Sequence, residues 1–258
     1  MSISGNVITT FLLALAFGTQ LLSVLVNTRL TGVGFYKLGN SIVLASFTLA
    51  CASMLFIAKI DMSSAALWAM GLILGTNALT YALHRDQKSW LMWVFYALQI
   101  LAFSFLAFDL YAPASGWSMF FFYTAALLGV SNFAMILGHY YLVVPKLSEE
   151  PLIYTLYVFW TILFLRVMSS VSVFLTAAQP FLQEGTELGD GYTFNWLFIS
   201  MRYLWGYLAP FILSLFTYRL CRIRSIQSAT GVLYIIEFFV IVGEMISIYL
   251  MSKHGLAL

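Results

Sequence analysis

Eight long apolar segments fill most of the chain, and each is long enough to cross a lipid bilayer. They are residues 7–27, 40–58, 64–84, 89–109, 117–144, 152–178, 194–219 and 230–251. A helix needs about 20 apolar residues to cross the hydrocarbon core of a membrane. Because backbone polar groups in lipid must bond within their own segment, such segments form helices. The sequence therefore predicts an all-α integral membrane protein, an eight-transmembrane-helix bundle with short loops and a single domain over residues 1–258.

The composition agrees with a chain that is mostly surrounded by lipid. Charged residues make up 9% of the sequence, whereas soluble domains have about 25%. The net charge of +2 is too small to indicate a nucleic-acid partner. Two cysteines, Cys51 and Cys221, are too few for a disulfide framework or a thiolate metal site. We therefore expect a lipid bilayer as the main partner, no nucleic acid and no metal.

Basic residues are distributed unequally between the two sides of the predicted bundle. With both termini outside, only Lys59 and Lys253 lie outside, against eight basic residues inside. The eight are Arg29, Lys37, Arg85, Lys88, Lys146, Arg219, Arg222 and Arg224. By the positive-inside rule both termini are predicted to be outside, which is the periplasm if the protein lies in the bacterial cytoplasmic (inner) membrane. The first residues, MSISGN, contain no basic residue, so we interpret the first segment as a retained helix.

Two predicted helices carry the same short polar pattern, an asparagine followed seven residues later by a histidine. Seven residues make nearly two helical turns, so each asparagine shares a face with its histidine. A histidine can hydrogen-bond a quinone carbonyl, and two histidines at one depth can ligate a b-type haem. The alternative is that both histidines are ordinary interfacial or helix-bridging residues. The candidate cofactor-binding residues are Asn77, Tyr81, His84, Asn132, His139 and Tyr140.

Four charged residues lie inside predicted membrane helices, where a charge is costly and usually faces the bundle interior. Glu237 and Glu244 are seven residues apart and share one face of the last helix. Carboxylates along one stripe suit a proton path or a bound cation, and the alternative is that they pair with the membrane arginines. Arg202 and Glu244 fall at similar depths, so we predict a buried ion pair between them. Arg166 is expected either to be the second partner of a glutamate or to hold an anionic ligand.

Two local signals concern helix geometry. Pro210 lies inside the seventh segment, where its ring and missing N–H predict a kink. The stretch SIQSATG before the last segment looks like a helix start, with Ser228 or Thr230 as the predicted N-cap.

The predicted topology is similar to that of the membrane anchor subunits of polysulfide and dimethyl-sulfoxide reductases, although no motif of theirs occurs here. That resemblance implies a quinone between helices and partner redox subunits. The first hypothesis is therefore a subunit of a respiratory or other redox complex that binds a quinone, with b-type haem less favoured, near the cytoplasmic face. The second is a small-solute or proton-coupled carrier using the buried arginines and glutamates. The third is a non-catalytic assembly subunit. A lipid-acting enzyme is least favoured, because no catalytic constellation is visible.

Overall fold

The computed structural model describes residues 3–23, 33–58, 62–83, 90–111, 116–143, 148–177 and 192–258 of the chain. Within those ranges every regular element is a helix, and eight spans are long and apolar enough to cross a membrane. The chain is thus an integral membrane protein, and its all-helical class and eight spans are as the sequence predicted.

The spans include two stretches of π-helix, labelled η. In chain order the elements are α1 (Ile3–Leu22), α3 (Val33–Ala52), η2 (Ser53–Ala58), α4 (Ser64–Leu83), α5 (Trp90–Tyr111), α6 (Trp117–Val143), α7 (Glu150–Ala177), α8 (Tyr192–Tyr203), η5 (Leu204–Leu208), α9 (Ala209–Arg222) and α10 (Ile226–His254). The second span begins seven residues before its predicted start. Its first turns contain glycine, lysine and asparagine, so hydropathy alone did not include them in the predicted span. Their backbone groups still form helical hydrogen bonds.

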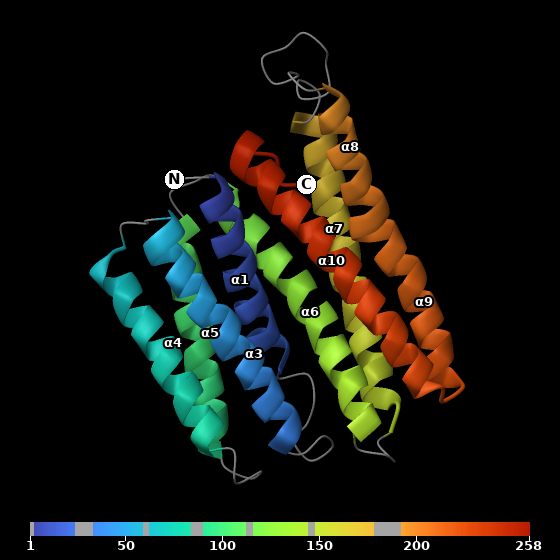
Figure 1. Cartoon of the computed structure of the whole chain (residues 1–258), viewed down its shortest axis with the longest axis horizontal. Helices are drawn as coiled ribbons and strands as arrows, with labels where there is room; N and C mark the ends of the chain where they lie inside the picture. Colours follow the sequence, from blue (N-terminus) through green and yellow to red (C-terminus); the bar gives the residue numbers. More distant parts are fainter. Residues whose placement is uncertain are drawn as a thin grey trace.

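Helix α6 lies in the middle of the bundle (Figure 1). It packs against α1 on one side and against α10 and α7 on the other. The helices α3, α4 and α5 lie on the α1 side, whereas α8, η5 and α9 lie on the α10 side (Figure 1). Helix α1 begins and α10 ends at the same end of the bundle (Figure 1). The candidate charges are therefore all on the α10 side.

Glycine pairs bring two sets of helices into direct backbone contact. Gly18 of α1 faces Gly129 of α6, and Gly206 of η5 faces Gly243 of α10. A Cβ atom at Gly18, Gly129 or Gly243 would overlap the backbone of the facing glycine, and one at Gly206 would lie 3.0 Å from the Cα of Gly243. Such contacts are typical of membrane bundles, where small residues let helices approach closely. The second pair also lies against Arg202, whose Nη1 would be 3.2 Å from a Cβ at Gly243.

The seventh span changes to π-helical geometry immediately before Pro210. The backbone N–H of Ala209 donates to the oxygen of Leu204, five residues back rather than four. Pro210 has no N–H, and its ring would clash with the oxygen of Gly206 in a regular α-helix. The wider π-helical turn relieves this conflict, so the predicted kink site coincides with a change of helix type.

The predicted N-cap of the last helix is wrong. Helix α10 begins at Ile226 with Ser225 in the N-cap position, and Ser225 makes no side-chain capping bond. Ser228 and Thr230 therefore lie inside the helix. The Thr230 hydroxyl is 2.9 Å from the main-chain oxygens of both Gly138 and Ile226. The Thr230 hydroxyl therefore contacts α6 and does not cap the start of α10.

We predict that Gly243→Ala destabilises the fold, because the added methyl group must push η5 away from α10. Overpacking of this kind costs about 1–3 kcal/mol. The measurement is the melting temperature of the purified protein in detergent. Gly231→Ala, on the same helix but facing open space, is the matched control and should not lower it. Equal melting temperatures for the two variants would contradict the close contact.

Candidate functional site

Three charged side chains from three helices meet inside the bundle. Arg166 comes from α7, Arg202 from α8 and Glu244 from α10, and all three side chains have no exposed surface. Arg202 Nη2 lies 2.8 Å from Glu244 Oε1, and Arg166 Nη2 lies 3.4 Å from Glu244 Oε2. We call these residues the charge cluster. The pair expected from helix depth is thus present, and Arg166 is the second partner of the same carboxylate.

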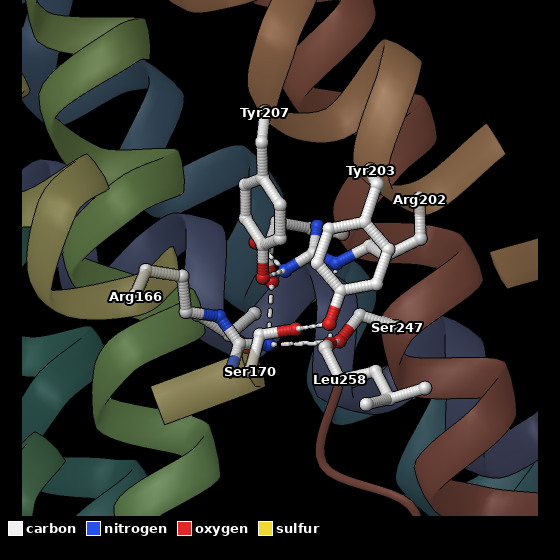
Figure 2. A network of polar contacts seen from close by, with 9 residues as sticks. Arg166, Ser170, Arg202, Tyr203, Tyr207, Ser247 and Leu258 are labelled. Atoms are coloured by element: carbon white, nitrogen blue, oxygen red, sulfur yellow. Dashed lines mark hydrogen bonds and ion pairs between the residues drawn. The ribbon is translucent and has the colours of Figure 1, made fainter. Parts of the chain in front are cut away.

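The end of the chain folds back onto the charge cluster (Figure 2). Gly255 adopts φ +70° after α10, and the chain turns inward from there. The main-chain oxygen of Leu258 accepts hydrogen bonds from Arg166 Nη2 and Arg202 Nε, both at 3.1 Å. It also accepts one from the Ser247 hydroxyl. The two guanidinium groups therefore converge on one oxygen atom besides the carboxylate.

Two tyrosines cover the charge cluster (Figure 2). Arg202 Nη2 donates to Tyr207 Oη at 2.5 Å, and the Arg202 guanidinium lies 4.1 Å from the centre of the Tyr207 ring. Ser170 donates to Tyr203 Oη at 3.2 Å. Residues five apart do not face each other in an α-helix, but a π-helical turn brings them together. The change of helix type before Pro210 thus explains why Arg202 meets Tyr207.

Several guanidinium nitrogens of the charge cluster have no hydrogen-bond partner among the described residues. They are Nε and Nη1 of Arg166 and Nη1 of Arg202. All the acceptors of Arg166 lie at its Nη2 atom, which has only two hydrogens. The Glu244 carboxylate and the Leu258 oxygen each accept hydrogen bonds from both arginines through other nitrogens. Buried unpaired donors are costly, so the cluster favours a further anionic or strongly polar acceptor.

Glu237 stands apart from the charge cluster although it shares a stripe of α10 with Glu244. Its side chain is buried beside Ser131 of α6, and its Oε2 atom has no partner among the described residues. No arginine or lysine in the described part of the chain pairs with it. The structure therefore gives the two glutamates different roles, one paired and one not.

The candidate cofactor-binding residues of α6 face different neighbours. Asn132 is buried and donates to Thr19 of α1 at 2.7 Å. His139 is exposed, and its Nδ1 lies 3.0 Å from Tyr234 Oη on α10. Tyr140 packs edge-to-face against an aromatic ring of α3. Asn132 thus bridges helices, whereas His139 and Tyr234 form a pair on the exposed outer surface of α6 and α10.

The candidates from α4 lie elsewhere. Asn77 is buried with neither polar side-chain atom partnered among the described residues, and Tyr81 is about half exposed. Helix α4 packs mainly against α3 and α5, whereas the main partners of α6 are α1, α10 and α7. The structure does not gather the two polar stripes into one site. His84 lies outside the described residues, so the haem pair with His139 stays a prediction.

Sequence reasoning missed Tyr203, Tyr207, Ser247 and the Leu258 oxygen. Ser247 follows Glu244 by three residues and so shares its helix face. This spacing is the sequence signal that could have identified Ser247. Tyr207 could be found only by placing a π-helical turn before Pro210. Leu258 could be suspected from Gly255, since a glycine after a helix often turns the chain back.

We predict that Glu244→Gln strongly destabilises the protein, because it leaves two buried arginines with no carboxylate. Removing one partner of a buried ion pair costs about 3–5 kcal/mol. The melting temperature in detergent should fall sharply. Glu149→Gln is the control, because Glu149 pairs with Arg224, whose side chain is 78% exposed. An equal effect of both substitutions would show that the charge cluster is not an important structural contact.

The arrangement can hold an anion by charge and by hydrogen bonds, and it can hold a proton at Glu237. Among the described residues no group of histidine, cysteine, aspartate and glutamate is arranged to bind a metal ion. No protein-family model, no curated protein and no solved structure matches this chain.

Proposed function

We propose that the protein is a membrane carrier for a small organic monoanion, which binds between Arg166 and Arg202. The observation that carries this proposal is that two fully buried guanidinium groups share one side-chain carboxylate, while three of their nitrogens have no partner in the described part of the chain. A carboxylate can accept charge-assisted hydrogen bonds from more than one guanidinium nitrogen at once. Buried charges are stable only when they are paired and hydrogen-bonded, so binding lowers the cost of burying both arginines.

The depth of the charge cluster suits a carrier better than a surface receptor. Arg166 lies roughly 24 Å along α7 from Glu150 and roughly 17 Å from Ala177, from the helical rise per residue. An ion that reaches this depth from one side is well placed to leave on the other after a change of conformation. Glu237 lies about two turns from Glu244 and has no basic partner among the described residues, which supports coupling to a proton.

We predict saturable uptake of radiolabelled acetate, lactate and benzoate by proteoliposomes that contain the protein. Arg166→Gln should reduce uptake at least tenfold, because one of the two anion-binding guanidinium groups is lost. Arg224→Gln removes a largely exposed arginine and serves as the control. Both variants are first checked for a monodisperse elution profile. Uptake no faster than in empty liposomes, or unchanged uptake by Arg166→Gln, would refute the proposal.

A second candidate function is that of a membrane subunit in a redox complex, with a quinone as cofactor. The observation that favours it is the His139–Tyr234 pair at 3.0 Å, exposed on the surface of α6 and α10. A ring nitrogen and a phenol on a lipid-facing surface can together hydrogen-bond a quinone carbonyl. Partner subunits would dock on the exposed helix faces, and b-type haem remains the less favoured cofactor.

This candidate predicts that the purified protein contains extractable quinone and binds ubiquinone-1. His139→Leu should weaken that binding at least tenfold by removing the ring nitrogen, whereas His254→Leu should not. Binding is measured by quenching of the intrinsic tryptophan fluorescence. Protein that contains no quinone and does not bind the analogue would remove this candidate.

We further propose that the protein lies in the bacterial cytoplasmic membrane with both termini outside. Support comes from the eight-to-two distribution of basic residues in the sequence. Arg219 and Arg222 end α9, at the opposite end of the bundle from the end of α10 (Figure 1). The start of α1 and the end of α10 therefore lie away from this basic region.

A further inference from the structure

An apolar groove runs along the outside of the charge cluster, between α7 and the seventh span. Its volume is about 290 Å³, and we call it the α7–α9 groove. Trp160 and Val167 line it from α7, while Tyr203, Tyr207 and Phe211 line it from the other side. Phe211 is 43% exposed, so the groove opens toward the lipid.

The groove and the charge cluster share a wall. Tyr203 and Tyr207 line the groove and also make polar contacts in the network around the arginines. The two phenol rings lie next to each other and beside the Arg202 side chain (Figure 2). The Tyr207 ring therefore lies between the groove and the Arg202 guanidinium, whose Nη1 atom has no partner among the described residues.

We propose that the anion bound by the charge cluster is amphipathic, a carboxylate with one apolar chain. Its chain lies in the α7–α9 groove, and its carboxylate passes between Tyr203 and Tyr207 to Arg166 and Arg202. This inference rests on the proposed carrier function and names the class of its substrate. The substrate enters sideways from the lipid rather than from water.

Charge complementarity selects this occupant. Lipid tails are as apolar as leucine, so the groove alone gives a neutral chain little reason to leave the bilayer. A carboxylate adds charge-assisted hydrogen bonds to the guanidinium groups, which are stronger than neutral ones and often bidentate. From Trp160 to Val167 the groove extends roughly 10 Å along α7, enough for the part of the chain nearest the head.

Trp160 offers a direct reporter of the chain. Its indole Nε1 donates to Ser214 Oγ at 2.6 Å, which fixes the ring at the groove. Bromine atoms quench tryptophan fluorescence only at close range. A chain that carries bromine near its middle would place the bromine beside Trp160 when the carboxylate reaches the arginines.

The experiment titrates the full chain in nanodiscs with 9,10-dibromostearate and, separately, with the uncharged dibromostearyl alcohol. The acid should quench saturably, and Trp160→Phe should lose that component. The alcohol should need at least tenfold higher concentration. Val167→Phe fills the groove and should weaken quenching by the acid at least tenfold. Val94→Phe, the same substitution on the exposed face of α5, should leave it unchanged.

Two outcomes overturn the inference: the alcohol quenches Trp160 at the same concentrations as the acid, or Val167→Phe behaves like Val94→Phe. Uptake of acetate, lactate or benzoate separates the two proposals. If a short acid is taken up while the brominated acid does not quench Trp160, the amphipathic substrate is wrong and the carrier function stands. If no short acid is taken up, the carrier function is wrong. If the brominated acid then also fails to quench Trp160, the amphipathic ligand is wrong as well.

Discussion

Two arginines share one glutamate in a region from which water is largely excluded, and much of the structure depends on this arrangement. Each charge would be costly alone, so α7, α8 and α10 must stay close enough for Arg166, Arg202 and Glu244 to touch. The glycine contact between η5 and α10 makes this approach possible, because any side chain there would separate the two helices. Backbone packing and charge pairing therefore stabilise the same helix positions.

The helix type before Pro210 connects the local sequence to the candidate site. The π-helical turn of η5 relieves the proline's conflict with the preceding backbone, and it also brings Tyr207 onto Arg202. The ring then covers the guanidinium on the side of the α7–α9 groove. One residue that cannot form an ordinary helical hydrogen bond thus shapes the wall between lipid and charge.

Much of the architecture could be predicted because membrane spans follow from length and apolarity alone. The Arg202–Glu244 pair could also be predicted, since helix depth can be estimated by counting residues and unpaired charges in lipid are costly. The π-helical turn, Tyr207 and the Leu258 oxygen could not, because they depend on a change of helix type and on a chain reversal. The spacing predicts that the asparagine and the histidine of each repeat share a helix face. Their neighbours could not be predicted, because these depend on the spatial order of the helices.

The most direct measurement is a crystal structure of the protein grown with 3-bromobenzoate, with anomalous scattering used to locate the bromine. The guanidinium nitrogens that lack a partner among the described residues predict a carboxylate within hydrogen-bonding distance of Arg166 and Arg202, with the bromine toward Tyr203 and Tyr207. A cluster without bromine at saturating ligand, in which protein groups or ordered waters bond every guanidinium nitrogen, would contradict anion binding at this site.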